Sequence, residues 1–108
     1  MTKNYSALHE SMQTRTLANG LRICYLPKEG FSKTFAILAT DFGSVDASFT
    51  FEGKRYDTPA GVAHFLEHKM FEDEDGNALQ KFARTGASPN AFTSHTMTAY
   101  HFFLHRPV

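Results

Sequence analysis

The residues that could carry out chemistry are two histidines and a glutamate in the segment GVAHFLEHKMF, residues 61–71. On a helix, residues i, i+3 and i+4 share one face, so His64, Glu67 and His68 would lie together. Two imidazoles one turn apart suit Zn²⁺, which binds histidine nitrogen at ~2.0–2.1 Å. A neighbouring carboxylate can take a proton from a zinc-bound water, whose pKa falls toward ~7. The H-x-x-E-H pattern, the inverse of H-E-x-x-H, therefore predicts two metal ligands and a general base.

The pattern is short, and a second interpretation stays open beside the metal site. His64 and His68 could be core or surface residues that bind no metal. Glu67 argues against a purely structural role, because a charged side chain is rarely buried without a partner and its neighbours Phe65 and Leu66 are apolar. The residues alone leave both interpretations standing.

A catalytic zinc normally takes three protein ligands, and this sequence offers no clear third one. Glu72 would lie ~12 Å beyond His64 along a continued helix, too far to share an ion with both histidines. For the remaining candidates, exposure to water or packing in a strand is the simpler interpretation: Asp73, Glu74, Asp75, His95, His101 and His105. We therefore expect the third ligand to come from outside this chain.

The first half of the chain predicts mainly β-structure. Residues 1–12 are polar and are expected to form a loosely ordered arm. Residues 13–42 predict a hairpin and a further strand: Asn19-Gly20 suits a tight type I′ turn, and the apolar run at 33–42 suits a mostly buried strand. Residues 43–57 are rich in turn-forming residues and predict a connecting loop.

The second half predicts two helices and a strand. A helix over about 59–71 would carry the H-x-x-E-H residues, with Thr58 as its cap, Pro59 at its first position, and Gly61 marking close packing. A second helix is expected over about 77–85, ended by Gly86. After a turn at residues 88–90, a long strand rich in Thr, Phe and Tyr is expected over about 91–104. The order β-β-β-α-α-β indicates an α+β fold with a mainly antiparallel mixed sheet packed by helices.

Composition excludes several classes of partner. The 108 residues carry 11 basic and 11 acidic side chains, so a formal net charge of +0 gives no electrostatic case for nucleic acid or an acidic membrane. Cys24 is the single cysteine, which excludes an internal disulfide and favours a reducing compartment. No apolar run is long enough to span a bilayer, and the N-terminus does not resemble a signal peptide. We expect a cytoplasmic protein.

Four segments, in order along the chain, carry a resemblance to a known family: LANGLRICYLP, FGSVDASF, GVAHFLEHKMF and GASPNAFTSHTMTAYHF. Over about residues 16–103 the chain resembles the insulinase/pitrilysin/mitochondrial-processing-peptidase family of zinc metallopeptidases, which are inverzincins. The segment HFLEHKMFEDEDGNALQKFARTGASPNAFTS, residues 64–94, is most similar to a bacterial branch of zinc-dependent proteases. The resemblance implies that His64 and His68 bind Zn²⁺ and that Glu67 is the general base.

The resemblance also implies a substrate-binding strand. Asn90 and Ala91 match the edge strand on which family members bind substrate, where an extended peptide adds itself as one more strand. For Asn90, ordinary turn chemistry after Pro89 is the alternative. For Phe92 and Tyr100, packing is the simpler interpretation.

The chain departs from the family pattern after the last strand. Family members carry the third ligand, a glutamate, on a later helix, and a second half-molecule closes over the site. We therefore expect an N-terminal fragment of a metalloendopeptidase that acts on a peptide or small protein and needs its C-terminal half or a partner subunit. The fragment alone should be nearly inactive, hold zinc weakly and self-associate through exposed strand edges. The alternatives are a non-catalytic structural or binding subunit of the same fold family, and a zinc-free interaction domain.

Overall fold

The structure, a computed structural model, describes residues 1–74 and 76–105. The chain divides into two compact units, Met1–Phe31 and Ser32–Val108. Within the described residues the fold is α+β, built from antiparallel strand pairs and two α-helices. None of the helices in this part of the chain is long and apolar enough to cross a membrane.

The first unit is a three-stranded antiparallel sheet in the order β1-β2-β3. Its elements are β1 (Thr2–Tyr5), the 3₁₀-helix η1 (Ser6–Leu8), β2 (Glu10–Thr16) and β3 (Arg22–Tyr25). The expectation of a loose arm over residues 1–12 is therefore wrong. The terminal ammonium of Met1 donates to the Thr14 carbonyl at 2.8 Å, and the Thr14 amide donates back to the Met1 carbonyl at 2.8 Å. The polar side chains of this segment do not predict a strand, because backbone hydrogen bonds rather than apolar burial hold the strand in place.

The hairpin between β2 and β3 is present, but its loop is longer than a two-residue type I′ turn. The Leu17 amide donates to the Leu21 carbonyl at 2.9 Å, which leaves residues 18–20 as the loop. Asn19 Oδ1 accepts a hydrogen bond from the Leu21 amide at 3.1 Å. Three-residue hairpin loops commonly end in a left-handed residue, and here that residue is Gly20 at φ +85°.

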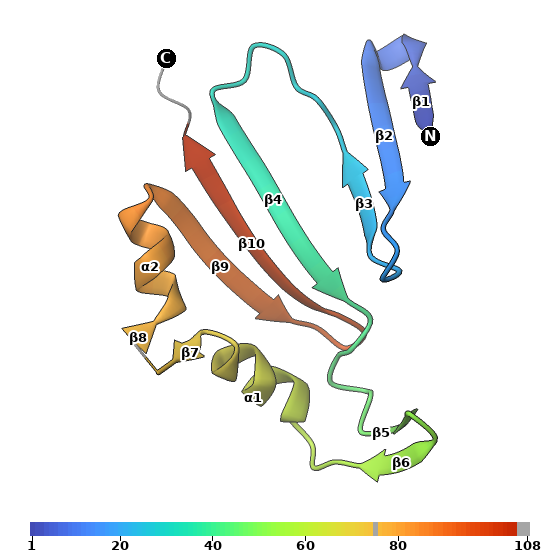
Figure 1. The fold of residues 1–108 in the computed structure, drawn as a ribbon, viewed down its shortest axis with the longest axis vertical. Helices are drawn as coiled ribbons and strands as arrows, with labels where there is room; N and C mark the ends of the chain where they lie inside the picture. The colour runs from blue at the N-terminus through green and yellow to red at the C-terminus, as the bar shows by residue number, and fades with distance from the viewer. Residues whose placement is uncertain (75, 106–108) are drawn as a thin grey trace. The chain divides into compact units, whose positions relative to one another are not determined.

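The second unit is built on the sheet β4-β10-β9, in which β10 is the central strand (Figure 1). The strands are β4 (Lys33–Thr40), β9 (Ala87–Thr93) and β10 (Thr98–His105), all antiparallel. The strand expected over 91–104 is thus two strands, separated by a turn in which the Ser94 amide donates to the Met97 carbonyl at 2.8 Å. Residues 88–90, expected to turn, lie in β9, where Pro89 is tolerated because β9 is at the edge of this sheet.

The expected loop over residues 43–57 contains a small hairpin, β5 (Ser48–Phe51) and β6 (Lys54–Asp57). Phe49 and Tyr56 face each other across it and stack with ring centroids 5.5 Å apart. Hydrogen bonds from Ser48 and Arg55 hold the pKa of Asp57 below its usual range. The aromatic pair and this polar pairing stabilise a hairpin that turn-forming composition alone does not reveal.

Helix α1 (Val62–Lys69) begins three residues later than predicted, and Thr58 does not cap it. Both the amide and the hydroxyl of Thr58 donate to the Ala47 carbonyl, at 2.7 and 2.9 Å. The N-cap position is Gly61, at φ +88°, a left-handed conformation that glycine adopts without strain. A Cβ at Gly61 would meet nothing within 4 Å, so the expectation of close packing there is also wrong.

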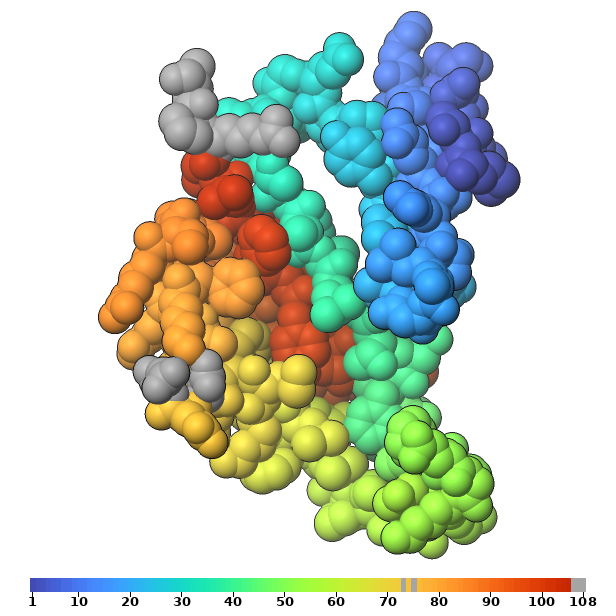
Figure 2. Space-filling model, in the orientation of Figure 1, coloured from blue at the N-terminus to red at the C-terminus, as the bar shows by residue number. Residues whose placement is uncertain are grey.

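The remaining elements are β7 (Glu72–Asp73), β8 (Gly76–Asn77) and α2 (Ala78–Arg84). Asn77 caps α2, because its Oδ1 accepts a hydrogen bond from the Leu79 amide at 2.8 Å. Helices α1 and α2 pack on one face of the sheet, where Phe71 contacts Tyr100 and Phe82 contacts Phe102. In Figure 2 the atoms around the end of α1 lie against those of β10.

The opposite face of this sheet is largely apolar and exposed. Phe35, Ile37, Phe92 and Phe103 are 50, 52, 42 and 43% exposed, respectively. By contrast, the buried apolar side chains among the described residues are only alanines: Ala63, Ala87 and Ala99. Exposed apolar surface of this kind is typical of a face that contacts other protein or a ligand.

The loop after β4 is held against the turn between β9 and β10. The Ser44 amide donates to the Ser94 carbonyl at 2.9 Å and the Val45 amide to the His95 carbonyl at 3.0 Å. A Cβ added to Gly43 would lie 2.5 Å from the His95 oxygen. Only glycine allows the two backbones to approach this closely.

Substituting Gly43→Ala is therefore expected to destabilise the protein by roughly 1–3 kcal/mol, the usual range for overpacking. The added methyl group must push the 94–97 turn away and break its two hydrogen bonds to the loop. Thermal unfolding of the full-length variant measures the effect. A melting temperature equal to that of the wild type would contradict this close approach.

Candidate metal centre

The two histidines of the H-x-x-E-H pattern converge on helix α1. The Nε2 atoms of His64 and His68 are 3.0 Å apart, their ring centroids are 4.8 Å apart, and both side chains are exposed. Two nitrogens bound to one tetrahedral zinc at ~2.0–2.1 Å would be about 3.3 Å apart. A small outward movement of the rings would seat the ion, so this pair fits two of the ligand positions of a zinc site.

Glu67 lies on the side of α1 that packs against the sheet. It is only 8% exposed, and its Oε2 accepts a hydrogen bond from the Thr93 hydroxyl at 2.6 Å. Thr93 is the last residue of β9, so the sheet supplies the partner that a buried carboxylate requires. Glu67 therefore sits at the inner edge of the face that carries the two exposed imidazoles.

Tyr100 of β10 is a second neighbour of this carboxylate. Burial raises the pKa of the Tyr100 phenol, and the negative charge of Glu67 raises it further. The phenol thus stays neutral to higher pH than an exposed tyrosine. Its ring packs edge-on against Phe71 with centroids 5.6 Å apart, in agreement with a packing role.

The other acidic and histidine residues do not complete the site. Within residues 1–74 and 76–105, no group of three or more His, Cys, Asp or Glu side chains is placed to hold a metal ion. Glu72 pairs with Lys69 at 2.5 Å, and His95 Nδ1 lies 3.3 Å from Ser44 Oγ. Asp75 and the side chain of Asp73 lie outside the described residues. Two ligands are therefore all that the described part of the chain brings together.

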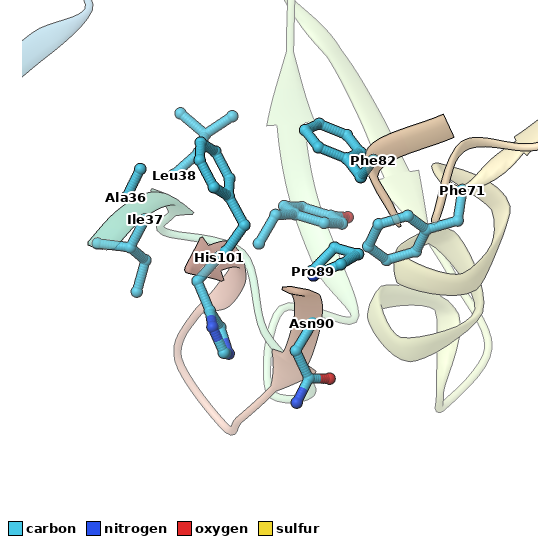
Figure 3. Close-up of a pocket in the computed structure, with 10 residues that line it drawn as sticks. Ala36, Ile37, Leu38, Phe71, Phe82, Pro89, Asn90 and His101 are labelled. Carbon is cyan, nitrogen blue, oxygen red and sulfur yellow. The ribbon is translucent and has the colours of Figure 1, made fainter. Parts of the chain in front are cut away.

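An apolar cavity of about 270 Å³ lies between the helices and the sheet, apart from the histidine pair. Figure 3 shows the Phe71 ring beside Pro89, while the side chains of Asn90 and His101 point away from it. The residues that line the cavity include none of His64, Glu67 and His68. The cavity is thus separate from the candidate centre.

Asn90 and Ala91 lie within β9, the strand at the edge of the sheet. They pair in register with His101 and Tyr100 of β10. Because Asn90 is part of a strand, turn chemistry does not account for it. Its Oδ1 accepts a hydrogen bond from the Ala91 amide at 2.9 Å. This strand contributes both residues with an expected role in substrate binding, and its last residue contacts Glu67.

The sequence did not single out Thr93 as part of the site. It is 26 residues from Glu67, so helical spacing could not link them. The one available signal was the conflict noted for Glu67: a carboxylate on a packed helix requires a partner. Hydroxyl-bearing residues at a strand end are candidates for that partner. This chain has more than one of them, so the sequence alone does not identify Thr93.

An α+β unit that sets an H-x-x-E-H helix against the edge strand of an antiparallel sheet has the features of a metallopeptidase domain. The chain belongs to the family described as Insulinase (peptidase family M16), whose sequence pattern matches residues 49–106.

Named relatives agree with this assignment. The chain is 49% identical over 100 residues to the uncharacterized zinc protease YmfH of Bacillus subtilis, covering 91% of this chain and 23% of that protein. It is 36% identical over 95 residues to the probable mitochondrial-processing peptidase subunit beta of Schizosaccharomyces pombe, covering 82% and 19%. The chain thus spans less than a quarter of the length of these relatives.

A solved structure gives the same result for the fold. A crystal structure described as that of a putative M16-like peptidase from Alicyclobacillus acidocaldarius matches with a TM-score of 0.82 and 42% sequence identity. The match covers 89% of this chain and 23% of that one. The α+β arrangement described above is therefore that of a part of an M16-like peptidase.

Proposed function

We propose that this chain is the N-terminal portion of the catalytic domain of a zinc-dependent metalloendopeptidase. His64 and His68 are two of the zinc ligands, and Glu67 is the general base. The observation that carries this proposal is the 3.0 Å separation of the two Nε2 atoms on a helix whose intervening glutamate is anchored to the sheet. The zinc protease named among the relatives supports the choice of metal.

In this mechanism each side chain has a separate task. Zinc, when bound, supplies Lewis-acid activation of water and of the peptide carbonyl. Glu67 accepts the proton of the attacking water and returns it to the leaving amine. His64 and His68 hold the ion through Nε2, which requires both nitrogens to be unprotonated. Glu67 lies on the same helix as the two ligands and is buried between that helix and the sheet, which keeps its carboxylate close to them.

The third ligand and the cover of the site come from protein outside these residues. We infer a glutamate on a later helix, and a second half-molecule or a partner subunit that closes over the centre. The exposed apolar face with Phe35 and Ile37 supports this, because it is suited to packing against further protein. With two ligands alone, these 108 residues would bind zinc weakly and show little activity.

The substrate is a peptide or small protein in extended conformation. Strand β9 pairs with β10 on one side, and its other side faces no strand among the described residues. A substrate strand could pair there through the backbone at Asn90 and Ala91, by β-augmentation. Backbone pairing depends little on sequence, which suits a peptidase of broad preference. The free Cys24 is consistent with a cytoplasmic setting.

Peptide hydrolysis by the full-length protein tests this function. We expect cleavage of unstructured peptides that a zinc chelator stops and that added Zn²⁺ restores, because the histidine pair must be filled for water to be activated. The assay follows release of a fluorophore from a quenched peptide. A non-catalytic subunit, the alternative from the same fold family, would show no cleavage with or without zinc.

A further inference from the structure

One contact of the proposed base is not explained by packing alone. Thr93 Oγ1 donates to Glu67 Oε2 at 2.6 Å, within the 2.5–2.7 Å range typical of a hydroxyl bound to a carboxylate. The two residues belong to separate elements, α1 and β9, so this bond joins the helix of the ligands to the edge strand. Among the described residues, Thr93 is the one that donates a hydrogen bond to the Glu67 carboxylate.

The bond leaves the two carboxylate oxygens in different situations. Oε2 is held by Thr93, whereas Oε1 accepts no hydrogen bond from the described residues. Oε1 is not among the fully buried polar atoms that lack a partner, so part of its surface reaches solvent although the residue as a whole is buried. A carboxylate fixed at one oxygen cannot rotate freely, and the other oxygen is then presented to water in a defined place.

We propose that Thr93 is a positioning residue for the general base: its hydroxyl fixes Glu67 through Oε2 and leaves Oε1 to accept the proton from water. This inference rests on the proposed function of Glu67. It assigns a role to the hydroxyl group of Thr93 and none to its methyl group.

The consequence is a specific kinetic pattern in the full-length, zinc-loaded protein. Thr93→Val keeps the shape of the side chain but removes the donor, and kcat should fall about 10–100-fold, as for other residues that orient a catalytic group. KM and zinc content should stay at wild-type values, because Thr93 touches neither histidine. Thr93→Ser retains the donor and should keep kcat within about threefold of wild type. If the valine variant does not fold, Thr93→Ala replaces it.

A matched control separates this role from a loss of stability. Thr98, the register partner of Thr93 on β10, is 3% exposed and donates its hydroxyl to the Phe42 carbonyl at 2.7 Å. Thr98→Val removes a comparable part-buried hydrogen bond in which Glu67 takes no part. It should lower the melting temperature but leave the kcat of the folded enzyme unchanged.

Crystal structures of the variants give a readout that does not depend on activity. In Thr93→Val the Glu67 carboxylate should adopt a new rotamer or several, and in Thr93→Ser it should return to the wild-type position. An unmoved carboxylate in Thr93→Val, a wild-type kcat in that variant, or equal losses in the valine and serine variants would each overturn the proposal.

A double substitution distinguishes a failure of the positioning role of Thr93 from a failure of the proposed function of Glu67. If Thr93 acts through Glu67, then Glu67→Gln combined with Thr93→Val should be no slower than Glu67→Gln alone. Additive losses would mean that Thr93 acts independently, which overturns its positioning role and leaves Glu67 as the base. A fully active Glu67→Gln protein would instead remove the proposed function itself.

Discussion

The full-length protein with Glu67→Gln is expected to lose about 10²–10⁴-fold in kcat, the usual contribution of a general acid–base residue. Glutamine has the size of glutamate, and its amide oxygen can still accept the hydrogen bond from Thr93. What it lacks is a group that can take a proton from water. Helix α1 and both histidines are left unchanged, so zinc content should equal that of the wild type. The measurement pairs kcat for peptide cleavage with zinc content.

Glu72→Gln is the matched control for this substitution. Glu72 lies five residues further along the chain, beyond the end of α1, and its carboxylate pairs with Lys69 at 2.5 Å. Its removal costs one exposed ion pair, which typically contributes little, so kcat should not change. Cleavage by Glu67→Gln at the wild-type rate would rule out Glu67 as the base.

Replacing either histidine should have the second large effect, a loss of zinc together with activity. His64→Ala or His68→Ala removes one of the two converging Nε2 atoms. The loss of zinc affinity should exceed the 10–100-fold that follows removal of a residue that only supports a ligand. Equilibrium dialysis against buffered zinc measures the affinity of each variant, and kcat should fall in parallel with zinc content.

His95→Ala is the control for the histidine variants. His95 is exposed, lies in the turn between β9 and β10, and contacts Ser44 rather than the helix. Its loss should leave zinc affinity unchanged. Wild-type affinity in both His64→Ala and His68→Ala would mean that the metal, if bound, is held elsewhere.

The parts of the site that the sequence could predict are those that depend on local geometry. The meeting of His64 and His68 follows from the helical repeat, because residues four apart lie one turn apart. Only the presence of a helix is required, and its exact start does not matter. This is why the ring geometry agrees with expectation although α1 begins at Val62 and not at Pro59.

The parts that could not be predicted depend on contacts between distant residues. Thr58 has the chemistry of a helix cap, but its hydroxyl donates a hydrogen bond to the carbonyl of Ala47, eleven residues earlier. Thr93 meets Glu67 only because β9 packs beside α1. Neither partner is visible in local propensity, since both follow from how the strands are arranged.

The division of residues 91–104 into two strands has the same origin. The segment is rich in β-forming residues throughout, so composition favours one strand. The break at 94–97 is fixed by the Ser94–Met97 hydrogen bond and by the amides of Ser44 and Val45, about fifty residues earlier, which bind the turn. In the same way, pairing of Phe49 with Tyr56 makes a hairpin of residues that composition assigns to a loop.

X-ray absorption at the zinc edge of the full-length protein tests the central claim most directly, because it reports the atoms bound to the metal. We predict one zinc per chain with two imidazole nitrogens at ~2.0–2.1 Å and oxygen in the remaining positions. In His64→Ala the imidazole contribution should fall by half or the metal should be lost. A spectrum dominated by sulfur, or one that His64→Ala and His68→Ala leave unchanged, would contradict a zinc centre on helix α1.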